Sequence, residues 1–261
     1  MKLALFLSIL TCLFFTSLCL AVEATDLVFY YTFDQLDGNT VLDQSGNGLN
    51  GDINGKINIV DGGKFGKAAE FQSGAFIDVH GADVPEELIP VDEITLCAWI
   101  NLKSDGQDHA IFNAKASDGT WIMHPESKGG GGNFRWLLRS DGGATIFDFT
   151  AGAVDYDNWQ HYAGTYDGKR GTLYIDGEVV GEGNGGAKIA KDWGSGARVG
   201  KNIDDARPFA GLMDDINVWK VALTKEEIKI VMEKSAGEMI KPEAVSPAGN
   251  MTTTWGKLKS R

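Results

Sequence analysis

Residues 94–101 read Ile-Thr-Leu-Cys-Ala-Trp-Ile-Asn, and this stretch decides the fold class. Apolar and other side chains alternate along it, which is the period of an extended strand with two unlike faces. The more uniformly apolar face is the one expected to point into a hydrophobic core. The two faces are Ile94, Leu96, Ala98 and Ile100 on one side, and Thr95, Cys97, Trp99 and Asn101 on the other.

Short runs of the same kind recur on both sides of this stretch, separated by turns. Asp167-Gly168 and Asp176-Gly177 are strong turn signals between neighbouring runs, and Ser73-Gly74 suggests a hairpin-like connection. Many short strands at close spacing predict an antiparallel sandwich rather than a helical fold. The predicted strands are 27–33, 68–71, 75–79, 94–101, 110–113, 121–123, 134–139, 145–149, 159–166, 172–175, 178–180 and 209–219.

One helix is expected near the end of the chain. Thr224 and Glu227 form a capping-box pattern, and Ile228, Val231 and Met232 then recur at helical spacing. This apolar stripe predicts a short helix that docks on the sandwich and ends near Gly237.

Composition limits the classes of partner. The chain has 261 residues, 43% of them hydrophobic, which is enough apolar material for a core. Its formal net charge is −12, and an acidic surface repels nucleic acid and anionic lipid headgroups while it suits solubility and cation binding. We therefore expect no nucleic-acid partner.

The first residues are typical of an export signal. Lys2 precedes a mostly apolar run, and small residues at Ala21 and Ala24 offer cleavage points. This predicts a signal peptide over 1–24, a single domain over 25–236 and a flexible C-terminal tail over 237–261. The protein is then secreted or held in the cell envelope or periplasm, with no membrane span after cleavage. The alternative interpretation of the first segment is an uncleaved membrane anchor.

Four stretches in order resemble the laminin-G-like jelly-roll family of the concanavalin A-like lectin/glucanase superfamily. The resemblance implies an all-β fold, a two-sheet antiparallel jelly-roll sandwich with one short C-terminal helix, and a general binding role. The chain departs from members that carry a disulfide, because Cys97 is the only cysteine after residue 24. The stretches are Tyr31–Asp34 with the loop 43–51, 94–100, 159–168 with 173–177, and 209–216 with Trp219 and 222–228.

A calcium site is the first candidate site. Asp34, Asp43 and Asn47 offer hard oxygen ligands close together in sequence, and neighbouring glycines let backbone carbonyls turn inward. Asp214 is a fourth candidate, because strand alternation places it on one face with Ile216 and a buried carboxylate needs pairing or a metal. Similar proteins carry such an ion near this loop. The competing interpretation is that these residues only make turns.

A carbohydrate-binding surface is the second candidate. Sugars stack an apolar face on aromatic rings, and polar side chains bind their hydroxyls. The strands predicted to line one sheet supply candidate residues for this role, with burial in the core as the competing interpretation. The candidates are Trp99, Trp121, Trp136 and Arg139.

Enzymatic activity is the rival class. Glucanases of this fold place two carboxylates at alternate positions on one strand, so that both project into one cleft. The sequence has no such run, and Asp148 stands alone in its strand. The sequence therefore predicts an exported, non-catalytic binding module for a glycan or cell-surface polymer with a structural Ca²⁺. A protein-interaction or structural surface module is the alternative, and a glycoside hydrolase is less favoured.

Overall fold

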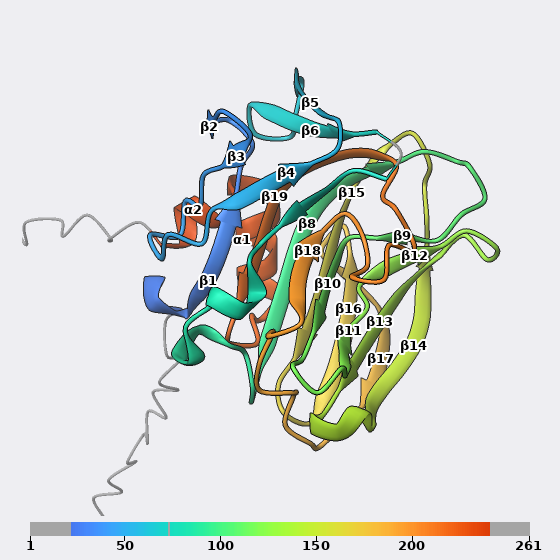
Figure 1. Cartoon of the computed structure of the whole chain (residues 1–261). Helices are drawn as coiled ribbons and strands as arrows, with labels where there is room; N and C mark the ends of the chain where they lie inside the picture. Colours follow the sequence, from blue (N-terminus) through green and yellow to red (C-terminus); the bar gives the residue numbers. More distant parts are fainter. Residues whose placement is uncertain (1–21, 73, 241–261) are drawn as a thin grey trace, which may run out of the picture.

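The computed structural model describes residues 22–72 and 74–240 and confirms the predicted architecture. The described strands form two antiparallel sheets that pack face to face, with the predicted helix outside them (Figure 1). The chain is therefore an all-β jelly-roll sandwich.

Sheet A is the eight-stranded sheet among the described residues, and it contains residues 94–101. Its first and last strands along the chain, β1 and β19, pair with each other, as expected of a sandwich. In spatial order its strands are β17 (Glu178–Asn184), β16 (Arg170–Ile175), β15 (Trp159–Tyr166), β8 (Ile94–Leu102), β19 (Gly211–Trp219), β6 (Lys67–Phe71) and β5 (Ile57–Asp61), with β1 (Leu27–Tyr31) on β19.

Sheet B holds the other eleven described strands. In spatial order they are β2 (Leu36–Asp37), β3 (Thr40–Val41), β4 (Gly51–Asn54), β7 (Phe76–Asp78), β18 (Gly196–Val199), β10 (Phe112–Lys115), β11 (Trp121–Met123), β13 (Asn133–Arg139), β12 (Glu126–Lys128) and β9 (His109–Ala110), with β14 (Thr145–Ala153) on β13.

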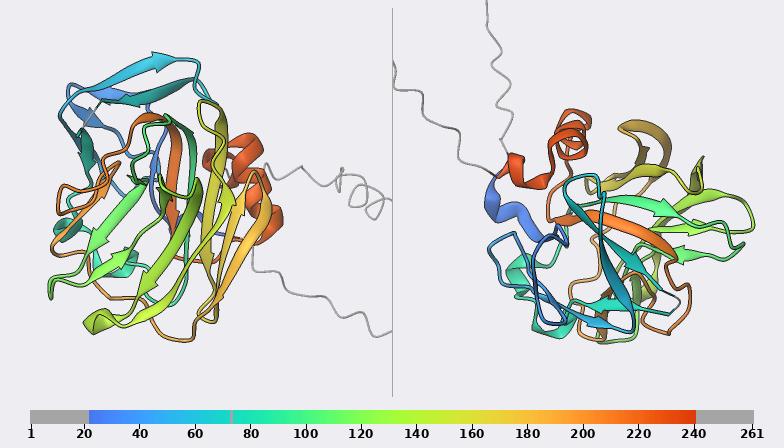
Figure 2. Two further views of the ribbon diagram at one scale, coloured as in Figure 1. Left: turned by 90° about the vertical axis from the view of Figure 1, so that its right-hand side faces the viewer. Right: turned by 90° about the horizontal axis from the view of Figure 1, so that it is seen from above.

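Two α-helices and four 3-10 helices complete the described chain. Helix α1 begins after Thr224, whose hydroxyl accepts from the Glu227 amide while the Glu227 side chain binds back, so the predicted capping box is present. Figure 2 shows α1 and α2 on the side of sheet A that faces away from sheet B. The helices are α1 (Lys225–Lys234), α2 (Ala236–Met239), η1 (Ala24–Asp26), η2 (Gly81–Asp83), η3 (Glu86–Leu88) and η4 (Asp141–Gly143).

The alternation in β8 sorts its side chains between two hydrophobic clusters. Leu96 and Ile100 belong to the main core between the sheets, as predicted. Cys97 lies on the opposite face, in a second cluster with Ile228 and Val231 of α1. The amphipathic helix therefore covers the outer face of sheet A, and this face is not open to solvent at β8.

Two connections differ from the sequence-based expectation. The Asp176-Gly177 turn forms as predicted, with both residues in the left-handed region. The strands on either side of Ser73-Gly74 do not make a hairpin, because β6 pairs within sheet A and β7 within sheet B. Strands β2, β3, β4, β5, β12 and β18 were not predicted, because most of them are short and carry few apolar residues.

The domain boundaries predicted from composition fall close to the packed region. Val22 and, at the other end, Met239 and Ile240 pack against the second cluster. The folded part therefore extends a few residues beyond the predicted domain of 25–236. Residues 1–21 of the predicted signal peptide and 241–261 of the predicted tail lie outside the described residues. No helix in the described ranges is both long and apolar enough to cross a membrane.

Trp136 joins the two sheets at the centre of the core. It belongs to β13 of sheet B, and its side chain is fully buried. Its indole Nε1 donates to the backbone oxygen of Thr165 on β15 of sheet A, at 2.9 Å. A Cβ added at Gly164 on β15 would lie 2.9 Å from the Trp136 ring. The absence of a side chain at Gly164 therefore makes room for the indole.

This close approach predicts that Gly164→Ala destabilises the protein by about 1–3 kcal/mol, because an overpacked core must shift to admit the methyl group. Urea denaturation measures the effect. Gly130→Ala is the matched control, since a Cβ there meets open space. Equal unfolding free energies for the two variants would show that Trp136 does not pack against this glycine.

Candidate functional site

A pocket on the outer face of sheet B brings together polar and aromatic side chains. Its cavity volume is about 240 Å³. Two of the sequence-predicted ligand residues, Trp121 and Arg139, lie in it side by side. We call this the Trp121 pocket. It is lined by Trp121, His124, Arg135, Arg139, Asn202, Asp204 and Arg207.

The alternation of β13 explains why its arginines line the pocket. Phe134, Trp136 and Leu138 point into the main core. Arg135 and Arg139 occupy the intervening positions, so they project to the outside of sheet B. Burial of the aromatic positions therefore fixes the direction of both guanidinium groups.

A fully buried carboxylate, Glu126, anchors two of the arginines. Its Oε1 lies 2.8 Å from Arg135 Nη1, and its Oε2 lies 3.2 Å from Arg207 Nη1. Arg135 also binds both carboxylate oxygens of Asp148, at 2.7 Å each. Such bidentate, charge-assisted contacts hold a guanidinium in one orientation. The guanidinium groups of Arg135 and Arg207 are therefore held in place in the wall of the pocket.

Arg139 is held more loosely than its neighbours. Its Nη1 donates to the backbone oxygen of Trp121 at 3.1 Å, which sets the guanidinium beside the indole. The Lys115 ammonium lies 4.5 Å from the centre of the Trp121 ring. The two side chains give the pocket N–H donors next to an aromatic surface.

His124 contributes a neutral imidazole. Burial, together with the positive charges of Arg207, Arg135 and Arg139, lowers the pKa of His124 to about 3. The ring is therefore uncharged at physiological pH. Its Nδ1 accepts from Arg207 Nη1 at 3.4 Å, which leaves Nε2 as a donor. The His124 imidazole, the Asn202 amide and the Asp204 carboxylate thus provide hydrogen-bond donors and acceptors that suit a polyhydroxyl ligand.

The other two predicted ligand residues are not part of an exposed surface. Trp136 is in the core, so the expectation that it contacts a sugar is wrong. Trp99 is only 7% exposed, because its indole Nε1 donates to the backbone oxygen of Met232 in α1 and the Lys64 ammonium covers its ring at 4.0 Å. Strand alternation placed Trp99 correctly on the outer face, but the helix docks over it.

The four predicted calcium ligands separate into two pairs. Asp43 and Asn47 organise the loop after β3. The Asp43 carboxylate accepts from the amides of Tyr30, Ser45 and Leu49, at 2.9 to 3.0 Å. Asn47 Nδ2 donates to the backbone oxygens of Leu27 and Val28. The side chains of this pair therefore tie the loop to β1.

Asp34 and Asp214 form the second pair, and both carboxylates contact the segment that joins β5 to β6. Asp34 Oδ1 accepts from the Lys67 amide at 2.9 Å, and Asp214 Oδ2 accepts from the Phe65 amide at 3.0 Å. Added Cβ atoms at Gly63 and Gly66 would lie 2.7 Å and 2.4 Å from these carboxylates. The turn therefore wraps closely around both side chains.

Asp214 is buried for a different reason from the one predicted. A bulge in β19 puts Asp215 in the left-handed region at φ 53°, and Met213 and Ile216 both point into the main core. Asp214 consequently does not share a face with Ile216. It lies opposite Trp99 in the ladder and is still fully buried.

The Asp214 side chain is an incompletely satisfied buried group. Its Oδ1 atom is buried without a hydrogen-bond partner among the described residues. Burial raises the pKa of Asp214 to about 6, and the nearby Asp34 charge raises it too. Burial likewise raises the pKa of Asp215 to about 7; its carboxylate accepts a hydrogen bond from the Tyr30 hydroxyl. Residues 22–72 and 74–240 contain no group of three or more His, Cys, Asp or Glu side chains placed to hold a metal ion.

Sequence analysis missed most of the Trp121 pocket. Arg135 stands four positions before Arg139 on β13 and therefore on the same face, so the strand period contained a signal for it. Glu126 lies in an unpredicted strand and His124 lies just before it, after β11. Asn202, Asp204 and Arg207 lie in the connection between β18 and β19. No local pattern marks that connection as part of a site. The additional residues are His124, Glu126, Arg135, Asn202, Asp204 and Arg207.

Comparison with known proteins identifies relatives of the fold. The family described as "Concanavalin A-like lectin/glucanases superfamily" matches residues 78–229. A search of curated proteins gives no match. Among solved structures, the chain is similar to domain 4 of AbnA, a GH43 extracellular arabinanase from Geobacillus stearothermophilus, in complex with arabinotriose. The identity is 24% and the TM-score 0.59, and the alignment covers 78% of this chain and 97% of that domain.

Two toxin domains share the fold at lower identity. The binding domain of Paraclostridial Mosquitocidal Protein 1 is 18% identical with a TM-score of 0.56, and the alignment covers 80% of this chain and 52% of that one. The ligand binding domain of botulinum neurotoxin serotype D, in complex with N-acetylneuraminic acid, is 15% identical with a TM-score of 0.58. That alignment covers 81% of this chain and 51% of the toxin domain. The chain thus spans about half of each toxin domain.

The buried position of Glu126 predicts that Glu126→Ala destabilises the protein by about 3–5 kcal/mol, because the variant leaves Arg135 and Arg207 without their shared counter-charge. Urea denaturation measures the loss. Glu182→Ala is the control, since it removes an exposed partner of Arg170 and is expected to cost less than about 1 kcal/mol. Similar losses in the two variants would mean that Glu126 does not anchor the pocket.

Proposed function

The chain belongs to the concanavalin A-like lectin/glucanases superfamily, and from this premise we propose that it is an exported, non-catalytic module that binds carbohydrate in the Trp121 pocket. The observation that carries the proposal is the juxtaposition of the Trp121 ring with the free donors of Arg139. An aromatic face beside convergent polar groups suits a ligand that is apolar on one face and hydroxylated at its edge.

The anchored walls of the pocket support this proposal. Glu126 and Asp148 fix Arg135, so little side-chain entropy is lost there when a ligand binds. The domain of AbnA was solved with arabinotriose and the serotype D toxin domain with N-acetylneuraminic acid, so relatives of this fold bind sugars. The export part of the proposal rests on the apolar segment within residues 1–24.

The electrostatics of the pocket favour binding over hydrolysis. A glycosidase needs a carboxylic acid whose raised pKa keeps a proton available. The hydrogen bonds from Arg135 hold the pKa of Asp148 below its usual range, which makes this side chain a poor proton donor. Glu126, the other carboxylate on Arg135, is fully buried behind two arginines.

We also propose a structural calcium ion at Asp34 and Asp214. The buried Asp214 Oδ1, which has no partner among the described residues, and the nearby Asp34 carboxylate would supply hard oxygen ligands. A bound cation would offset the cost of burying the Asp214 charge. Asp43 and Asn47, which the sequence suggested as ligands, would act indirectly by holding the adjacent loop.

A protein-interaction role is the second candidate function, and one surface feature favours it. β17 is an edge strand of sheet A, and its Val179 and Val180 are 47% and 36% exposed. Exposed apolar side chains on a sheet edge suit pairing with another chain. A binding partner that is lost on Val179→Lys but kept on Trp121→Ala would favour this function.

We expect Trp121→Ala and Arg139→Ala each to weaken glycan binding at least tenfold, since each removes about 1.4 kcal/mol or more of contact free energy. A glycan array identifies the ligand and titration calorimetry measures its affinity. Arg170→Ala is the matched control, because Arg170 is an exposed arginine on β16 paired with Glu182. Array signals that survive both pocket substitutions would contradict the proposal.

Calcium is expected to raise the melting temperature by several degrees over the value in chelator, since a ligand at about 100 times its Kd adds about 2.7 kcal/mol to the native state. Differential scanning calorimetry of the wild type and Asp214→Asn tests this. The variant should melt at one temperature in both buffers. Equal melting temperatures of the wild type in calcium and in chelator would contradict a bound calcium ion.

A further inference from the structure

A second pocket lies between the η2–η3 segment and the connection that leads into β18. Its cavity volume is about 330 Å³, and it shares no lining residue with the Trp121 pocket. We call it the Trp193 pocket. It is lined by Gly81, Ala82, Val84, Glu86, Ile89, Ser117, Lys191, Asp192, Trp193 and Gly194.

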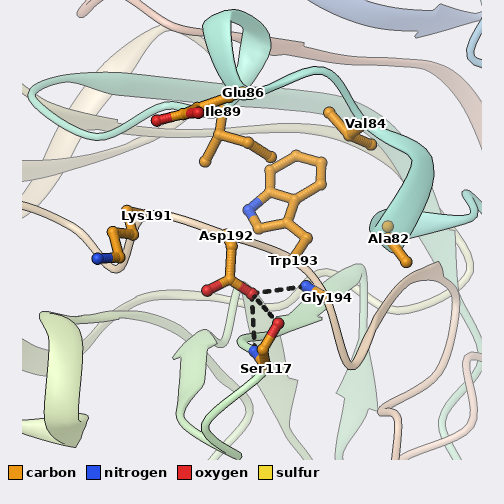
Figure 3. Close-up of a pocket in the computed structure, with 10 residues that line it drawn as sticks. Ala82, Val84, Glu86, Ile89, Ser117, Lys191, Asp192, Trp193 and Gly194 are labelled. Atoms are coloured by element: carbon orange, nitrogen blue, oxygen red, sulfur yellow. Dashed lines mark hydrogen bonds between the residues drawn. The ribbon is translucent and has the colours of Figure 1, made fainter.

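Trp193 has an unsatisfied polar atom at this pocket. Its side chain is 1% exposed and contacts Phe112 in the core, with ring centres 5.5 Å apart. Its indole Nε1 is buried without a hydrogen-bond partner among the described residues. Figure 3 shows the ring between Ile89 and Val84, with the nitrogen on the side of Lys191. An N–H group that is buried without an acceptor destabilises the protein, so a ligand that supplies an acceptor here is favoured.

The polar groups around the indole are arranged by a rigid carboxylate. Asp192 Oδ1 accepts from the amide and hydroxyl of Ser117 and from the amide of Gly194, at 2.7 to 2.8 Å (Figure 3). These contacts hold the second Asp192 oxygen at the pocket. Glu86 and Lys191 stand exposed at the rim, so the pocket offers both acceptors and donors above an apolar floor of Val84 and Ile89.

We propose that the Trp193 pocket is a second carbohydrate subsite, which binds one neutral sugar ring and gives the Trp193 N–H a hydroxyl oxygen as its acceptor. A hydroxyl group both donates and accepts, so a polyol satisfies the carboxylates, the ammonium and the indole at once. The apolar side of the ring lies against Val84 and Ile89. The volume is near the lower end of about 300–1,000 Å³ that small-molecule sites occupy, which fits one ring.

The indole nitrogen is covered by its neighbours, so the sugar reaches it after a side chain of the pocket wall moves aside. Ile89 and Glu86 come from the η3 segment, a short 3-10 element rather than a paired strand. Side-chain adjustments of this kind are common on binding.

The hairpin formed by β10 and β11 contributes one residue to each of the two pockets. Ser117 lines the Trp193 pocket and Trp121 lines the other, and the hairpin carries both. The subsite takes the same ligand class as the proposed function but rests on its own observation, the unpartnered indole. The two are therefore tested separately.

The test is a ¹H–¹⁵N spectrum of the full-length protein, in which each tryptophan indole gives its own resonance. The Trp193 and Trp121 resonances are assigned from Trp193→Phe and Trp121→Phe. The protein is titrated with arabinose, glucose, galactose and N-acetylglucosamine. We expect at least one sugar to move the Trp193 resonance downfield in a saturable way, because the proton gains an acceptor.

Each outcome decides one of the two sites. Movement of Trp193 alone supports the subsite and counts against the proposed function, and movement of Trp121 alone does the reverse. If no sugar moves the Trp193 resonance, a buried water satisfies the indole and the subsite is overturned.

Two substitutions check the assignment. Trp193→Phe keeps an aromatic ring against Phe112 and is expected to weaken sugar binding at this pocket about tenfold. Should that variant not fold, Glu86→Ala at the exposed rim replaces it, with its exposed neighbour Glu87→Ala as the control. Unchanged sugar affinity in Glu86→Ala overturns the proposal.

Discussion

The burial of Trp136 between the two sheets is the constraint on which the Trp121 pocket depends. The indole fills the core from β13 and donates to Thr165 on the opposing sheet, so β13 has only one orientation in which the core is filled. Since side chains alternate along a strand, that orientation directs Arg135 and Arg139 outward. A shift of β13 by one residue would exchange the two faces and bury both arginines.

The pocket shows how an acidic protein holds a cluster of arginines. Glu126 and Asp148 neutralise Arg135, and Glu126 also lies against Arg207, so these cations cost little mutual repulsion. Within the described residues, Arg139 donates to the backbone oxygen of Trp121, and in our proposal its other N–H groups bind the ligand. Arg135 and Arg207 therefore shape the pocket, whereas Arg139 is the arginine proposed to contact the ligand.

The strands that were predicted well are those whose own residues determine their two faces. The alternation in β8 sorted Leu96 and Cys97 correctly, because each face packs on a different apolar surface. Features that depend on tertiary contacts could not be predicted from the sequence. The bulge at Asp215 reversed the expected phase of Asp214, and docking of α1 covered Trp99. The Trp121 pocket combines strands β11 and β13 with a distant loop, and no local pattern encodes that combination.

The most direct measurement is a crystal structure of the protein with the oligosaccharide that binds best on an array. Our account predicts a sugar ring against the face of Trp121, with its hydroxyls within hydrogen-bond distance of Arg139. A glycan bound at the β17 edge or elsewhere on sheet A, with the outer face of sheet B empty, would contradict it.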